Sequence, residues 1–109
     1  MSRYATHLAG RSYGRLGTVV DHPPVLTIHG YDTTHALNRA VQRDGTTSDR
    51  FHAVRDPLVV LEQRQGQAYL FLSERAVVVL KTDGMVITTY GVSDFDDKIR
   101  QILNDAGAH

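Results

Sequence analysis

The stretch LVVLEQRQGQAYLFLSERAVVVLKTDGMVITTYG, residues 58–91, decides the fold. It contains four short apolar runs, at 58–62, 68–72, 76–81 and 85–90. Gly66 supplies the positive φ that a tight hairpin needs, and Asp83-Gly84 favours the primed turn that matches the twist of two paired strands. This spacing predicts a four-stranded antiparallel meander with one face buried.

The residues before this stretch predict two helices. The first is expected to be capped by Asp32, Thr33 or Thr34 and to end at Gly45. Its apolar stripe recurs at helical spacing and comprises Ala36, Leu37, Ala40 and Val41. The second is short, begins at a cap formed by Ser48 or Asp49, and ends at Pro57. Its apolar residues are Phe51, Ala53 and Val54.

A third helix is expected after the meander, over 94–104, with Ser93 as its cap. Its first turn is acidic, which suits the helix dipole, and Gly107 lies past its end. Its apolar stripe comprises Phe95, Ile99, Ile102 and Leu103. At the other end of the chain, residues 1–24 show no sustained period and predict an irregular or weakly helical arm, which ends at Pro23-Pro24. The apolar run 25–28 predicts a short edge strand.

The whole pattern predicts an α+β fold in one domain, residues 1–109, because the length is near the commonest domain size. The arm occupies 1–24, the core 29–91 and the C-terminal helix 93–106. A pair of helices packed on one face of the four-stranded antiparallel sheet would leave the other face open as a platform.

Composition excludes several classes of protein. Hydrophobic residues make up 41% of the chain, which argues against intrinsic disorder. There is no cysteine, so a disulfide scaffold, a thiolate metal site and a cysteine nucleophile are excluded. No apolar run approaches the roughly 20 residues that cross a bilayer, and the N-terminus lacks the apolar stretch of a signal peptide. We therefore expect no membrane partner, and export would depend on something outside these residues.

The charge is balanced overall but not along the chain. Twelve basic and twelve acidic residues give a formal net charge of zero, which argues against a general nucleic-acid binder. Residues 1–43 carry five arginines and two aspartates, an excess of +3, whereas residues 82–109 carry two basic and five acidic residues, an excess of −3. Ten of the twelve basic residues are arginine, whose planar fork suits phosphate. A coding bias toward arginine would give the same composition.

The usual catalytic and metal-binding motifs are missing. Six histidines are present, but none forms an HxH, HExxH or HxxxH pair, so neither a metal nor another cofactor is expected. There is also no G-x-S-x-G nucleophile elbow and no phosphate-binding loop of the G-x-x-x-x-G-K-[ST] kind.

One face of the first predicted helix carries the strongest candidates for catalytic residues. His35, Arg39 and Arg43 are spaced four apart on the first predicted helix and stack over about 12 Å on one face. That face is offset from the apolar stripe, so the three side chains could flank a groove. The alternative is an ordinary solvated face with a histidine near its cap.

The last predicted strand carries a second candidate group. Thr88 and Tyr90 share one face of a strand, while Ile87 and Thr89 share the other. If Ile87 points into the core, Thr88 and Tyr90 point to the open face. The alternative is that threonine and tyrosine are simply good strand residues.

Together these two groups resemble a family. The order HAxxRxxxRxG on an early helix, a short second helix, an antiparallel meander and a last strand D-G-x-[VI]-[IV]-T-x-Y is similar to the barnase, EndoU, colicin D and RelE-like superfamily of ribonucleases. It resembles more closely the C-terminal toxin domains of contact-dependent growth inhibition and other polymorphic toxins of bacteria. The resemblance covers roughly residues 29–91.

The resemblance implies a metal-independent endoribonuclease that acts on RNA, most plausibly tRNA. His35, Arg39, Thr88 and Tyr90 would be catalytic. Arg43, His29 and Thr89 would help to bind or position the substrate. The resemblance also implies a cognate immunity protein as partner, and delivery by a larger secreted or cell-surface toxin into the cytoplasm of a target cell.

Two other interpretations stay open at this point. The chain could be a non-catalytic module that binds protein or RNA through the open sheet face. It could also be a toxin of other chemistry, such as a DNase or a nucleotide-transferring enzyme, on a similar frame. Cleavage of RNA in the presence of EDTA would separate the first interpretation from both.

Overall fold

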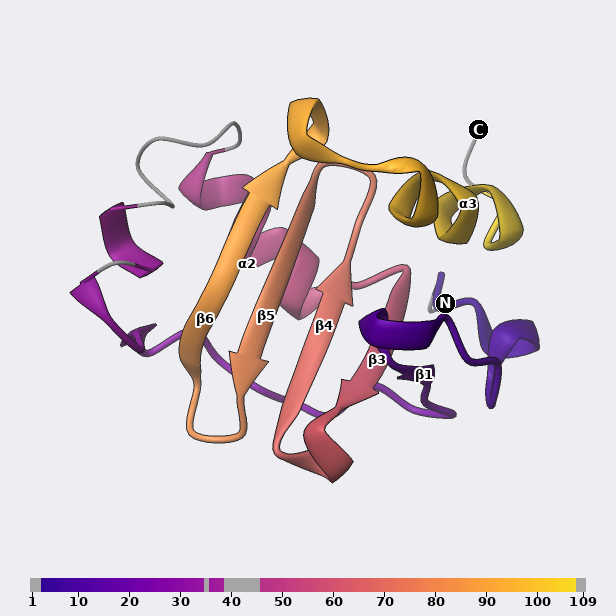
Figure 1. The fold of residues 1–109 in the computed structure, drawn as a ribbon, viewed down its shortest axis with the longest axis horizontal. Helices are drawn as coiled ribbons and strands as arrows, with labels where there is room; N and C mark the ends of the chain where they lie inside the picture. Colours follow the sequence, from indigo (N-terminus) through magenta and orange to yellow (C-terminus); the bar gives the residue numbers. More distant parts are fainter. Residues whose placement is uncertain (1–2, 35, 39–45, 108–109) are drawn as a thin grey trace.

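The computed structural model describes residues 3–34, 36–38 and 46–107. Its centre is a six-stranded sheet in the order β1-β3-β4-β5-β6-β2, mostly antiparallel (Figure 1). The strands are β1 Thr18–Val19, β2 Gly30–Tyr31, β3 Val59–Gln63, β4 Ala68–Leu72, β5 Ala76–Lys81 and β6 Met85–Gly91. The fold is therefore α+β, as the sequence predicts.

The four strands β3 to β6 form the predicted antiparallel meander. Their apolar runs, continuous in β3 to β5, and the turns between them carry the information that sets the order and register. The sheet is nevertheless larger than expected, because β1 pairs antiparallel with β3 and β2 pairs parallel with β6. Each of these added strands is two residues long, too short to show any alternation in the sequence.

The predicted edge strand at 25–28 is wrong. Those residues are extended but belong to no strand, and Val25 is 98% exposed. The edge strand lies slightly later, at Gly30–Tyr31, where it pairs with Met85 and Val86. The described part of the arm, residues 3–24, is irregular, with 3-10 helices η1 Thr6–Leu8 and η2 Gly14–Leu16, but it also contributes β1 to the sheet.

The turn between β5 and β6 depends on Gly84. Its φ is +87°, and a Cβ at this position would overlap the carbonyl oxygen of Thr27 and the ring of His29. The backbone of the 27–29 segment therefore passes directly over the turn, where the amide of His29 donates to the carbonyl of Gly84 at 2.8 Å. The turn before β4 is looser than a tight hairpin: it is a 3-10 turn, η3 Arg64–Gly66.

The first helical turn begins at one of its predicted caps, whereas the two later helices begin at other residues than predicted. Thr33 caps a helical turn that includes residues 34 and 36–38, since its hydroxyl accepts from the amide of Ala36 at 2.9 Å. Helix α2, Thr47–Arg55, is capped by Thr46, and Asp49 completes a capping box with it instead of being the cap. The rest of the first predicted helix, over 39–45, lies outside the described residues.

The C-terminal helix begins later than expected. Helix α3 spans Asp97–Asp105 with Asp96 as its cap, and a 3-10 turn, η4 Val92–Asp94, precedes it. Asp96, and not Ser93, is the N-cap, because the carboxylate of Asp96 accepts a hydrogen bond from the amide of Ile99 at 2.9 Å. The described helices are too short to cross a bilayer.

Other elements pack on both faces of the sheet, so the platform is smaller than the fully open face that the sequence predicts. Figure 1 shows α2 behind the sheet, and the N-terminal arm in front of β3 and β4 with α3 above it. On the α2 side, Ala53 and Val54 pack with buried residues of β3 to β6. On the other side, Leu8 and Tyr13 of the arm and Ile99 and Ile102 of α3 bury the opposite face. The arm and α3 cover the part of this face formed by β3 and β4, whereas Thr88 and Tyr90 of β6 stay partly exposed.

Candidate functional site

A β-bulge in β6 decides which way the candidate strand residues point. Thr88 pairs with Val79, whereas the next pair along is Val86 with Leu80, so Ile87 is an extra residue. This irregularity breaks the expected alternation. Ile87 packs against the core on the α3 side, and Thr88 faces that side too, because its partner Val79 belongs to the same core. Ile87 and Thr88 therefore share a face, contrary to the sequence-based expectation.

Tyr90 and Thr88 share the α3 face of the sheet, as their spacing predicts. Tyr90 pairs with Val77, another residue of that core, and is partly buried against it. The ring of Phe95 meets the ring of Tyr90 edge-on, with centroids 6.2 Å apart and an angle of 80° between the planes. This contact holds the phenol in a defined position, while Thr88 stays half-buried beside it.

Thr89 points to the opposite face of the sheet. It is 1% exposed, and its hydroxyl donates to the carbonyl of Val77 at 2.8 Å. A buried hydroxyl held in this way stabilises the sheet and does not reach a ligand on the Thr88 side. The geometry therefore argues against the expected role of Thr89 in substrate binding and favours Thr88.

His29 lies at the other end of β6. Its exposed ring sits over Gly84, at the turn before the strand begins. With a rise of about 3.3 Å per residue, Gly84 and Thr88 are about 13 Å apart along the strand. The structure therefore separates His29 from Thr88 and Tyr90. His29 cannot contact the same phosphate as these two residues.

The helical candidates His35, Arg39 and Arg43 lie outside the described residues. The chain reaches them from β2, which runs parallel to β6 and points toward the end of the sheet that holds Tyr90. An ion pair holds the segment that follows β2 against the end of β5: Lys81 Nζ lies 2.8 Å from Asp32 Oδ1. The hydrogen bond to Asp32 and the charges of Asp32 and Asp83 raise the pKa of Lys81 above its usual value.

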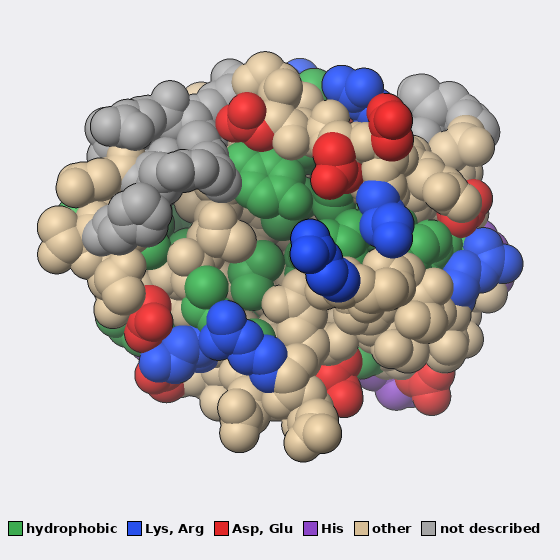
Figure 2. Space-filling view, viewed as in Figure 1, with side chains coloured by type: hydrophobic (Ala, Val, Ile, Leu, Met, Phe, Trp, Pro, Cys, Tyr) green, Lys and Arg blue, Asp and Glu red, His purple; other side chains and the backbone are tan. Residues whose placement is uncertain are grey.

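The described part of the α3 face is not a cationic surface. Figure 2 shows Lys and Arg side chains interspersed with Asp and Glu side chains around a hydrophobic patch. Three exposed aspartates, Asp94, Asp96 and Asp97, follow directly after β6. Phosphate binding beside Thr88 and Tyr90 would therefore depend on cations outside the described residues, such as Arg39 and Arg43.

A polar pocket of about 450 Å³ lies on the α2 side, between α2 and the turn from β4 to β5. Arg3 organises it: Nη1 donates to both carboxylate oxygens of Glu74 at 2.7 Å, and Nη2 lies 3.5 Å from His52 Nε2. Arg3 also pairs with Asp56 at 3.3 Å. The remaining residues of the lining are Ser48, Asp49, Arg55, Ser73 and Arg75.

These contacts set the ionisation of Glu74. Partial burial acts to raise its pKa, but the hydrogen bonds from Arg3 and from the backbone and the charges of Arg3 and His52 outweigh it. The net effect lowers the pKa of Glu74 below its usual value of 4.5. The carboxylate is thus a fixed anion that holds Arg3 in place.

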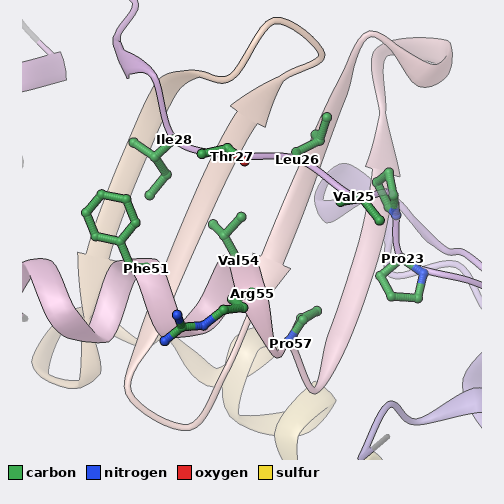
Figure 3. Close-up of a pocket in the computed structure, with 10 residues that line it drawn as sticks. Pro23, Val25, Leu26, Thr27, Ile28, Phe51, Val54, Arg55 and Pro57 are labelled. Carbon is green, nitrogen blue, oxygen red and sulfur yellow. The ribbon is translucent and has the colours of Figure 1, made fainter.

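An apolar pocket of about 350 Å³ adjoins the polar one. It lies between α2 and the extended segment 23–28, and Figure 3 shows the ring of Phe51 reaching toward Ile28 across it. Phe51 is 44% exposed and Val25 almost fully exposed. Arg55 lines both pockets, so the two form one continuous surface.

The sequence did not reveal this surface, because its residues come from three separate segments. The only available signal was on α2, where Ser48, His52 and Arg55 share a face at helical spacing. Arg3 and Arg75 join them only through the fold. Among the described residues, no group of three or more histidines and carboxylates is arranged to hold a metal ion.

Comparison with known proteins identifies one relevant relative. The chain is 38% identical over 65 residues to the tRNA nuclease WapA of Bacillus subtilis (strain 168). The match covers 56% of this chain and 3% of the length of that much larger protein. No family model matches the chain, and no solved structure matches it.

Proposed function

We propose that this chain is a bacterial toxin domain that cleaves tRNA as a metal-independent endoribonuclease. The observation that carries the proposal is the similarity to a tRNA nuclease over more than half of the chain. The helix motif with His35, Arg39 and Arg43 and the strand residues Thr88 and Tyr90 provide the residue types that such a reaction needs.

The reaction uses the substrate's own 2′-OH as the nucleophile. Its oxygen forms a bond to the adjacent phosphorus, and the bond from phosphorus to the departing 5′ oxygen breaks. The attacking oxygen loses its proton to a base, and the 5′ oxygen gains one from an acid, which leaves a 2′,3′-cyclic phosphate. Because DNA lacks the 2′-OH, it is not a substrate.

In this proposal His35 transfers the protons and Arg39 stabilises the charge that develops on the phosphorane. Thr88 and Tyr90 hold the phosphate or a base with their hydroxyls, and Arg43 adds a cation beside them. Tyr90 suits this role because its ring is held by Phe95 at one end of the sheet. His29 is too far along β6 to bind the same phosphate, so it contacts a more distant part of the RNA.

A nuclease of this kind would kill the cell that makes it, so the proposal includes a cognate immunity protein. A site built from His35, Arg39 and Arg43 is cationic, and acidic residues on the inhibitor would accelerate association. The proposal also includes delivery to a target cell as part of a larger toxin.

The test is incubation of the purified protein with total RNA in the presence of EDTA. The proposal predicts discrete fragments derived from tRNA. Intact RNA under all conditions would overturn it in favour of a binding module, and cleavage only after metal addition would overturn the metal-independent mechanism.

A further inference from the structure

The described lining of the two adjoining pockets on α2 contains none of the residues proposed for cleavage. Its apolar half has the exposed ring of Phe51, and its polar half has the guanidinium groups of Arg3, Arg55 and Arg75. Nothing in the proposed chemistry uses any of these four residues.

Two of the three arginines of the polar half are not neutralised by an ion pair within the described residues. Arg3 is held by Glu74 and Asp56. Arg55 and Arg75 are both exposed, and neither forms an ion pair with another residue that the structure describes. The lining of the polar pocket contains three arginines against two carboxylates, Asp49 and Glu74. Asp56 also pairs with Arg3, so an anion would bind through the two exposed arginines and not through an overall positive charge.

The apolar half has the shape and chemistry for a planar, uncharged group. Phe51 and Arg55 are four residues apart and therefore neighbours on one side of α2, as Figure 3 also shows. An exposed aromatic ring next to an arginine is the arrangement with which proteins bind single-stranded nucleic acid, by stacking a base and contacting its phosphate.

We propose that this surface is a second RNA contact, where an unpaired base of the substrate stacks on Phe51 and the adjoining phosphate binds Arg55 and Arg75. The inference rests on the proposed function for its substrate class. RNA is favoured over an apolar protein segment because Arg55, which forms no ion pair with a described residue, borders the apolar pocket directly, as the charge of a nucleotide requires. His52 also lines the polar pocket, from α2.

The experiment measures binding of a fluorescein-labelled 2′-O-methyl RNA oligonucleotide by anisotropy over a range of salt concentrations. This probe has no free 2′-OH, so the proposed mechanism cannot cleave it. Phe51→Ala is expected to weaken binding about 5-fold or more, the usual effect of losing one stacked base, while Phe51→Tyr binds like the wild type. The Arg55→Ala, Arg75→Ala double variant should make the salt dependence shallower by about 0.7 for each phosphate that it no longer neutralises.

Arg100→Ala is the matched control, because Arg100 is an exposed arginine on α3, far from both pockets in the sequence and absent from their lining. It should leave affinity unchanged. Thermal melts check that each variant is folded. Unchanged affinity in either Phe51→Ala or the double arginine variant overturns the proposal.

Cleavage of tRNA by the same variants separates this inference from the proposed function. A raised KM with an unchanged kcat supports a binding surface remote from the reacting phosphate. Normal KM in all variants, with tRNA still cleaved, overturns the surface and leaves the nuclease standing. A third outcome is that the wild type cleaves no tRNA but binds the oligonucleotide, and that Phe51→Ala loses this binding. This outcome supports the binding surface and overturns the nuclease proposal.

Discussion

Thr88 and Thr89 are adjacent residues that face opposite sides of the sheet, so substitution by valine tests them as a matched pair. Thr88→Val should reduce cleavage about tenfold or more, because a hydrogen bond to a charged phosphate is worth roughly 1.5–3 kcal/mol. Thr89→Val should stay active but lower the free energy of unfolding by about 1 kcal/mol, since it removes the buried hydrogen bond to Val77. Cleavage rates and urea unfolding measure the two effects, and the reverse pattern would assign the substrate contact to Thr89.

His35 carries the proton transfer in the proposed mechanism, and its substitution gives the sharpest effect on rate. His35→Ala should lower kcat by about two or more orders of magnitude, the usual effect of losing an acid or base. His22→Ala is the control, because His22 is exposed and has no part in the proposed site. Single-turnover cleavage of tRNA measures both. A His35→Ala variant with near wild-type turnover would disprove this assignment while leaving the nuclease proposal open.

At the scale of elements, the turn between β5 and β6 depends on Gly84 more than on the other residues of the turn. Gly84→Ala should destabilise the fold by several kcal/mol, because its Cβ would overlap the backbone of Thr27 and the ring of His29. Gly10→Ala is the control: Gly10 has the same φ of +87°, but nothing lies within 4 Å of the added Cβ. It should cost only about 1–2 kcal/mol of conformational strain. Equal unfolding free energies for the two variants would contradict the close packing seen over the turn.

The sequence predicts the long elements well and the short ones poorly. The strands at 68–72 and 76–81 match their predicted bounds because each is an unbroken apolar run with turn residues on both sides. The strands β1 and β2 are two residues long, too short to show a hydrophobic period. They form only because they pair with the edges of the longer strands β3 and β6. The bulge at Ile87 was equally invisible, since it depends on pairing with β5 and not on residue type.

At the scale of the whole molecule, Arg3 and Glu74 join the N-terminal arm to the turn between β4 and β5. Because this contact lowers the pKa of Glu74, its stabilising contribution is present above about pH 4.5 and is lost as the pH falls through the lowered pKa. Glu74→Gln should therefore lower the free energy of unfolding at pH 7, by about 1 kcal/mol for a half-exposed pair, and much less at pH 3.

Asp94→Asn is the control for this pH dependence, because Asp94 is exposed and has no ion pair with another described residue. Urea unfolding of both variants and of the wild type at the two pH values measures the difference. A loss of stability in Glu74→Gln that is equal at both pH values would show that the carboxylate acts through packing instead of charge.

Only part of the functional surface could be predicted from the sequence. The spacing of Thr88 and Tyr90 along β6 placed them on one face, as the structure has them. The pockets on α2 could not be predicted, because Arg3, Arg55 and Arg75 meet only once the arm, the helix and the turn are folded together. A search for motifs finds residues near each other in sequence, whereas this surface is assembled from distant segments.

The central claim is that this chain cleaves tRNA by attack of the 2′-OH without a metal ion. The most direct test is mass spectrometry of the fragment ends after digestion of tRNA in EDTA. The proposed mechanism predicts upstream fragments that end in a 2′,3′-cyclic phosphate, because the 2′ oxygen stays bonded to phosphorus. Fragments that end in a 3′-hydroxyl, with phosphate on the downstream 5′ end, would contradict it.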